Sequence, residues 1–230
     1  MDFTTSAFWA ALGSIILANI VLSGDNAVVI AMAARSLPAH EQNKAIFWGS
    51  AAAIVMRIVL TIVAVEMLRW PYLKIVGALL LPYIGTTLLS DNDGDDEDHA
   101  HQGNLVSAIR TILVADLVMS LDNVLAVAAA AKGNTPLLVI GLAVSIPLII
   151  FGSTLLLKVM DRFPVIITLG AALLGFLAGE MLMTDPAVTA RFGAVSHDSI
   201  NIAGAAGAVI VVMVGTALQR RARAKVAADA

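Results

Sequence analysis

The sequence predicts an all-α membrane protein with about seven transmembrane helices, built from two inverted three-helix repeats plus a C-terminal helix. Hydrophobic residues make up 59% of the 230 residues and charged residues only 13%, and the mean hydropathy is +0.90. The apolar residues form long stretches of the length that crosses a bilayer. In addition, a short motif that contains aspartate occurs twice, each time inside such a stretch. Together these observations predict a membrane protein with a repeated functional element.

Seven apolar segments are long enough to span a bilayer. They are Ala7–Ala34, Ala45–Leu68, Tyr72–Ser90, Leu105–Ala131, Pro136–Leu157, Pro164–Met183 and Ile200–Leu218. The connections are short and contain prolines, which suit helix boundaries. Alternating segments of about ten residues, typical of membrane β-strands, are not seen. The first segment opens with Asp2 and stays apolar for longer than the core of a signal peptide, so we expect a retained helix.

The predicted organisation has four parts. Residues 1–90 form the first three-helix repeat, and residues 104–184 form the second. Residues 91–103 form an acidic linker, and residues 185–230 contain an outer loop, the seventh helix and a basic tail. The acidic and histidine residues of the linker are Asp91, Asp93, Asp95, Asp96, Glu97, Asp98, His99 and His101. The linker is either a flexible solvated connection or a loop that collects cations.

The internal repeat has a spacing of 97 residues. It pairs Asn19 with Asp116, Ser23 with Ser120, Asp25 with Asp122, and Asn26 with Asn123. Further along the chain, Gly49 can be set on Gly141, and Gly77 on Gly170. Because each half has an odd number of spans, the two halves enter the membrane in opposite directions. In transporters, such an inverted repeat places the substrate site near the middle of the membrane, between the halves.

The repeated aspartates are the strongest candidates for a functional site. An aspartate at the centre of a membrane helix costs roughly 2.5–3.5 kcal/mol on insertion scales, so a chain that carries two is expected to use them. The candidate metal ligands are Ser23, Asp25, Asn26, Asp116, Ser120, Asp122 and Asn123. Such oxygen donors suit Mn²⁺, Mg²⁺ or Ca²⁺ and do not suit Cu⁺ or thiolate-bound zinc. The alternative is that each Asp-Asn pair only joins helices through hydrogen bonds.

Helix geometry adds one condition to this site. On a regular helix Asn19, Ser23 and Asn26 share a face, whereas Asp25 lies about 100° away from Asn26. A local unwinding near Gly24 would turn Asp25 inward and expose backbone carbonyls. Glycine makes this easier in the first half than in the second, where Leu121 occupies the matching position.

Three further charged residues lie within the predicted spans. Glu66 and Glu180 fall near the outer ends of their spans, where they are candidates for lining an exit path or exchanging protons; carboxylates at the interface that only contact water are the alternative. Arg57 lies close to the middle of the second span. It is expected to pair with an acidic residue, either as a structural contact or as a tethered cation that holds the empty site.

The distribution of Lys and Arg predicts the orientation. With seven spans and a cytoplasmic C-terminus, the N-terminus lies outside. The cytoplasmic side then holds Arg35, Lys44, Arg110, Lys158, Arg162, Arg220, Arg221, Arg223 and Lys225. The outer side holds only Arg69, Lys74, Lys132 and Arg191. Omission of one weak span would reverse one end.

The two motif regions, Asn19–Val28 and Asp116–Val124, resemble the TerC family of integral membrane proteins, and in particular its YjbE-like subgroup. The resemblance extends over roughly residues 5–218. It implies membership of the wider LysE-type transporter superfamily and a link to manganese efflux or, by historical name, to tellurite resistance. The acidic motif positions of the family fall on Asp25, Asp116 and Asp122. The tellurite association fits poorly, because an oxyanion would meet these carboxylates with only Arg57 to attract it.

These observations predict a secondary transporter in the cell (inner) membrane that exports a divalent cation, with Mn²⁺ as the expected substrate and no permanently bound cofactor. No phosphate-binding motif of an ATPase is present. An accessory membrane protein that delivers metal to secreted proteins, or a LysE-type amino-acid exporter, is the alternative. The expected partners are lipid, the cation and a second copy of the chain or a secretion-related protein. The net charge of −3 gives no reason to expect nucleic acid, and no catalytic constellation predicts an enzyme.

Overall fold

The computed structural model describes residues 6–22, 24–67, 72–90, 104–130, 135–193 and 195–229, although the side chains of some of these, including residues 62–67 and 122–130, are outside the description. The described residues form helices and contain no strands. The helices are α1 (Ser6–Leu22), α2 (Gly24–Arg35), α3 (Ala39–Met67), α4 (Leu73–Ser90), α5 (Leu105–Ala130), α6 (Thr135–Arg162), α7 (Val165–Thr184), α8 (Pro186–Phe192) and α9 (His197–Asp229).

The helices coincide with the predicted spans, and the first predicted span is divided into α1 and α2. Five described helical segments are long and apolar enough to cross a membrane, in α3, α4, α6, α7 and α9. Three predicted bounds were wrong, because α3 begins at Ala39, α6 extends to Arg162 and α9 extends to Asp229. The segment after residue 184, expected to be a loop, contains the short helix α8.

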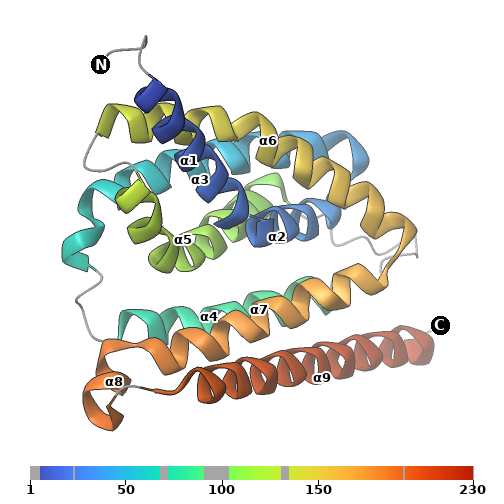
Figure 1. Cartoon of the computed structure of the whole chain (residues 1–230). Coiled ribbons are helices and arrows are strands. Elements are labelled where there is room, and N and C mark those ends of the chain that lie inside the picture. The colour runs from blue at the N-terminus through green and yellow to red at the C-terminus, as the bar shows by residue number, and fades with distance from the viewer. Residues whose placement is uncertain are drawn as a thin grey trace.

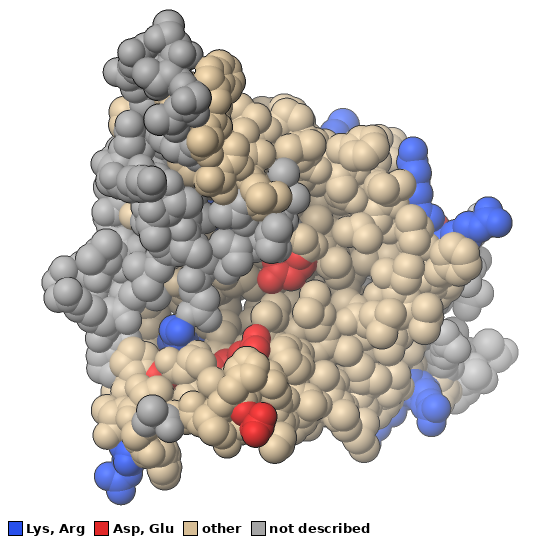
Figure 2. Space-filling view, in the orientation of Figure 1, with Lys and Arg blue, Asp and Glu red and all other residues tan. Residues whose placement is uncertain are grey.

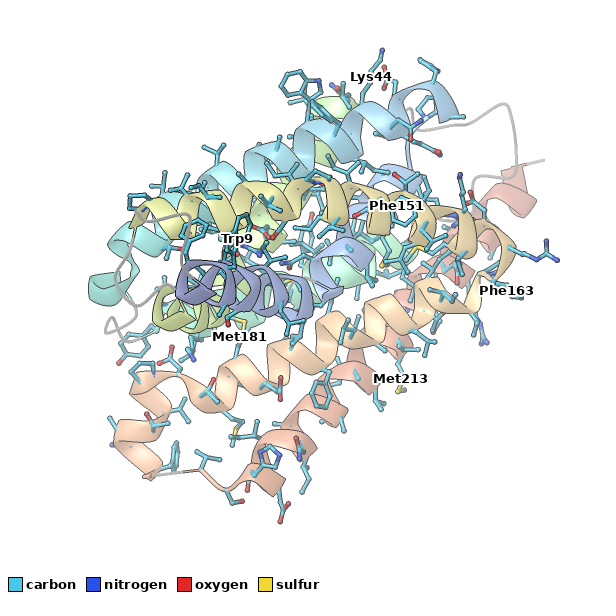
Figure 3. The ribbon with its side chains drawn as sticks, turned by 45° about the horizontal axis from the view of Figure 1, so that its top comes forward. Trp9, Lys44, Phe151, Phe163, Met181 and Met213 are labelled. Carbon is cyan, nitrogen blue, oxygen red and sulfur yellow. The ribbon has the colours of Figure 1, made fainter. Side chains whose placement is uncertain are left out.

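The helices form two groups (Figure 1). In the first group, α1, α2, α3, α5 and α6 pack around one another, and in the second α4, α7 and α9 lie side by side as a layer. The two groups meet where α4 packs on α5 and α7 packs on α2. Apolar side chains from both groups form one buried core. Large apolar side chains also cover the outer faces, as expected for contact with lipid: Phe151 and Met213, labelled in Figure 3, are 69% and 66% exposed.

Small residues allow close helix packing in two places. At Gly175 and Gly179 of α7, an added Cβ would collide with the backbone of α9 at Gly207 and Ala203. Such close backbone approach is typical of membrane helices, in which small residues replace the hydrophobic effect as the basis of association.

The second place involves a reciprocal pair of contacts. A Cβ added at Gly49 of α3 would lie 2.6 Å from the Cδ1 of Ile112 on α5. In the same way, a Cβ added at Gly141 of α6 would collide with Ile15 on α1. Ile15 and Ile112 are 97 residues apart, which is the spacing of the repeated motif. Two isoleucines at this spacing, on α1 and α5, therefore pack against glycines on α6 and α3.

Candidate functional site

A buried ion pair between α3 and α5 forms the centre of the site. Arg57 is 2% exposed, and its Nη2 donates a hydrogen bond to Oδ1 of Asp116, which is also buried. The Nε of Arg57 donates to the hydroxyl of Ser120 at 3.1 Å, and this hydroxyl donates to Asp116 Oδ2 at 3.2 Å. Asp116 and Ser120 lie one helical turn apart and share the face of α5 that meets α3. The guanidinium, carboxylate and hydroxyl thus form a polar network in which each group is hydrogen-bonded to the other two.

Asp25 lies at the bend between α1 and α2. The helix α1 ends at Leu22 and α2 begins at Gly24, and the two run in different directions (Figure 1). This bend falls where the sequence predicts an unwinding. Asp25 stands in the first turn of α2, half-buried, and its Oδ1 accepts the backbone N–H of Asn26 at 2.8 Å. Asp25 is close enough to Arg57 and Asp116 for their charges to act on it.

Asn26 is buried beside Asp25, and its side chain has no hydrogen-bond partner among the residues that the structure describes. It is 3% exposed, and neither its Oδ1 nor its Nδ2 is paired with any described residue. A buried amide without partners is costly, since most buried polar atoms in proteins are hydrogen-bonded. No described residue therefore donates to the carbonyl oxygen of Asn26, which lies next to the carboxylate of Asp25.

The structure brings together part of the predicted site. Asp25, Asp116, Ser120 and Arg57 interact electrostatically or through hydrogen bonds. Four other predicted residues lie outside the description: Ser23 entirely, and the side chains of Glu66, Asp122 and Asn123. Among the described side chains, no three Asp, Glu, His or Cys residues form a group able to hold a metal ion. A three-carboxylate site that includes Asp122 therefore stays a prediction.

Glu180 lies near the end of α7 and is half-buried. It forms no ion pair with another described residue, and its main-chain carbonyl accepts the hydroxyl of Thr184 at 2.9 Å. Figure 2 shows acidic side chains in the middle of a largely uncharged face, whereas Lys and Arg lie toward its edges. Carboxylates thus reach the surface within a largely uncharged face.

Asp185, a fully buried carboxylate at the end of α7, was not expected from the sequence to have a role. Its oxygens accept four backbone N–H groups, from Tyr72 at 3.1 Å, Lys74 at 3.1 Å, Ile75 at 3.3 Å and Ala187 at 2.7 Å. One carboxylate therefore caps α4 and α8 together and fastens the end of α7 to the start of α4. The dipeptide Asp-Pro, with Asp as N-cap and Pro at the first helical position, was the signal that could have identified it.

These features define a multi-pass integral membrane protein with a buried polar centre. The chain belongs to the integral membrane protein TerC family, which it matches over residues 4–226. It is 46% identical to the uncharacterized membrane protein YjbE of Bacillus subtilis over 167 residues, which cover 73% of this chain and 76% of that protein.

More distant similarities point to the same kind of protein. The chain is 24% identical to the uncharacterized membrane protein YceF of Bacillus subtilis, over 77% of this chain and 72% of that protein. It is also 24% identical to the UPF0053 inner membrane protein YoaE of Escherichia coli, over 71% of this chain but only 35% of that longer protein. No solved structure matches the chain.

Proposed function

We propose that this protein is a secondary transporter that exports a divalent cation, with Mn²⁺ as the substrate. The ion would bind near the middle of the membrane to Asp25, Asn26, Asp116, Asp122 and Asn123, assisted by Ser23 and Ser120. The observation that carries the proposal is the buried amide of Asn26, which has no partner among the described residues. It stands beside Asp25, which is within electrostatic range of Asp116. A bound cation would satisfy the Asn26 carbonyl and the carboxylates at once.

The chemistry of the donors supports a hard cation. Carboxylate, amide carbonyl and hydroxyl oxygens suit Mn²⁺, Mg²⁺ and Ca²⁺. The chain has no cysteine, so thiolate ligands for softer metals are excluded. An anionic substrate would be repelled by Asp25 and by any ionised carboxylate next to it.

We also propose that the two three-helix halves form an inverted repeat and alternate between two arrangements around this site. The reciprocal contacts of Gly49 with Ile112 and of Gly141 with Ile15 support this relation. So does the packing between elements, because α3 packs on α5 while α6 packs on α1 and α2.

In the orientation that we propose, the C-terminus and the acidic linker face the cytoplasm. The ends of α2 and α6 then lie together on the cytoplasmic side, where Arg35 forms an ion pair with Asp161 at 3.0 Å. The Asp185 cap lies at the opposite, outer end. An acidic linker on the cytoplasmic side would raise the local cation concentration at the entry, which supports export.

An amino-acid exporter is the second candidate, because Arg57 could bind a substrate carboxylate. In the structure, however, the Arg57 guanidinium is already engaged by Asp116 and Ser120. An accessory role in metal delivery uses the same ion site but needs a second protein. Transport by the purified chain alone separates these candidates.

The test is Mn²⁺ flux into liposomes that contain only this protein, together with thermal stabilisation of the detergent-solubilised protein by Mn²⁺, Mg²⁺, Ca²⁺ and Zn²⁺. We expect Mn²⁺ flux and Mn²⁺-dependent stabilisation, and we expect Asp25→Asn to abolish both. The matched control is Asp198→Asn, because Asp198 is exposed in the first turn of α9, away from the site. Flux that persists in Asp25→Asn, or a flat response to every metal, would contradict the proposal.

A further inference from the structure

We propose that Arg57 is a tethered cation that occupies Asp116 and Ser120 while the site is empty and withdraws when the divalent ion binds. This inference rests on the proposed function, since it concerns how the same site is held between transport events. A divalent ion and the guanidinium would compete for the Asp116 carboxylate, so Arg57 sets the affinity and permits release.

The first support is the position of the guanidinium. It bonds to two of the proposed ligands, Asp116 and Ser120, and its charge also acts on Asp25. It thus stands among the oxygen donors, where a cation would bind. The amide of Asn26 remains without a described partner in this arrangement, so the guanidinium engages only part of the ligand set.

The second support is a difference between the two halves. The repeat spacing that pairs Asp25 with Asp122 places Asn19 at the position of Asp116. The matching of Gly49 with Gly141 places Ile149, a buried residue of α6, at the position of Arg57. Asn19 thus stands at the position that matches Asp116, and Ile149 at the position that matches Arg57. The matching pair is neutral, whereas the Arg57–Asp116 pair is charged on both sides.

This difference argues against a purely structural role for the ion pair. The matching positions, Asn19 of α1 and Ile149 of α6, carry no charge, and α1 packs on α6, so a neutral pair of residues is compatible with this kind of packing. Replacing a buried ion pair by apolar residues is often neutral or stabilising, so stability alone gives no reason to keep it. We infer that the charge of Arg57 serves the site.

The charges of the proposed site fit a divalent ion. When Asp25 and Asp116 are both ionised, Arg57 balances one of these two negative charges in the empty site, whereas a divalent cation that displaces Arg57 balances both. Without Arg57 the empty site would hold a further uncompensated charge within the membrane, which is unfavourable. A transported ion must also leave its site, so binding has to be moderate. Competition from Arg57 both reduces the charge of the empty site and keeps the affinity for the ion moderate.

The test is a double-mutant cycle on Mn²⁺ affinity, measured by calorimetric titration of the full chain in detergent. The variants are R57I, D116N and R57I/D116N, and the last carries at both positions the residues of the matching positions Ile149 and Asn19. We expect R57I to lower the Kd for Mn²⁺ by about tenfold, as for loss of a close charge competitor. The double variant should not show this tighter Mn²⁺ binding, because the Asp116 carboxylate is no longer available to the ion. A structural ion pair predicts the opposite sign, with weaker binding in R57I.

A second readout and a second variant keep the outcome decisive. In liposomes, R57I should retain exchange of Mn²⁺ across the membrane but lose net flux about tenfold, because the empty site cannot reorient without its internal cation. If R57I is not recovered as a monodisperse protein, the test uses R57K. Lysine keeps the positive charge but cannot form the paired hydrogen bonds of arginine, so the Kd of R57K for Mn²⁺ should be several-fold lower than that of the wild type. An unchanged or higher Kd in R57K overturns the tether. Wild-type protein that binds no Mn²⁺ would instead overturn the proposed function itself.

Discussion

Gly175 of α7 and Gly207 of α9 are in backbone contact, so close that a side chain on either would overlap the main chain of the other helix. This contact fixes the layer of α4, α7 and α9 against which the bundle of α1, α2, α3, α5 and α6 is packed. Since backbone cannot move aside as a flexible side chain can, the two helices tolerate only glycine or a shift of the whole helix.

The first prediction follows from this packing. Gly179→Ala places a methyl group on the backbone of α9 at Ala203, and overpacking of this kind costs about 1–3 kcal/mol. Thermal unfolding in detergent should show a clear loss of stability. Gly152→Ala on α6 is the matched control, because a Cβ there meets nothing within 4 Å; it should unfold at the wild-type temperature or slightly above it. Equal stability of the two variants would contradict the close α7–α9 contact.

The second prediction concerns Asp185. Asp185→Asn keeps the size of the side chain but removes the charge and replaces one acceptor oxygen by an amide, so the caps of α4 and α8 are weakened together. Loss of a helix cap costs about 0.5–2 kcal/mol. Hydrogen exchange should therefore accelerate at the backbone amides of Lys74 and Ile75. Asp198→Asn, at the exposed start of α9, should leave these amides unchanged, and protection that survives in Asp185→Asn would rule out the shared cap.

The third prediction tests the unpartnered amide. Asn26→Leu keeps nearly the same shape and removes two buried polar atoms that have no described partner, so the metal-free protein should be as stable as the wild type or more stable. Saturating Mn²⁺ at about 100 times Kd should stabilise the wild type by about 2.7 kcal/mol and the variant far less. The measurement is the melting temperature with and without Mn²⁺.

The control for this variant is Ser50→Ala on α3. It also removes a buried polar group without a described partner, in this case a hydroxyl. It should retain the full Mn²⁺ effect. Full stabilisation of Asn26→Leu by Mn²⁺ would show that this amide is not a ligand.

The helix positions were predictable because apolar length and proline boundaries act locally. The change of direction between α1 and α2 falls next to Gly24, where the sequence predicts a local unwinding. The pairing of Arg57 with Asp116 was not predictable in the same way. It depends on how α3 and α5 pack, and sequence offered several carboxylates as partners.

Asp185 was overlooked for a related reason. Its partners at Tyr72 and Lys74 lie more than a hundred residues away along the chain, so only its local role as a cap of α8 could be read from the sequence. In addition, Tyr72 has a positive φ of 72°, a conformation that its residue type does not predict.

The last prediction concerns orientation, and the absence of cysteine from the chain makes it simple to test. In the proposed orientation, His40 at the start of α3 is cytoplasmic and Arg191 in α8 is outside; both are exposed. A membrane-impermeant maleimide should label Arg191→Cys in intact cells and His40→Cys only after permeabilisation. Phe151→Cys is the control, because the exposed outer face of α6 would contact lipid, where a thiol does not ionise and reacts slowly. The reverse pattern would place the acidic linker outside and remove its support for export.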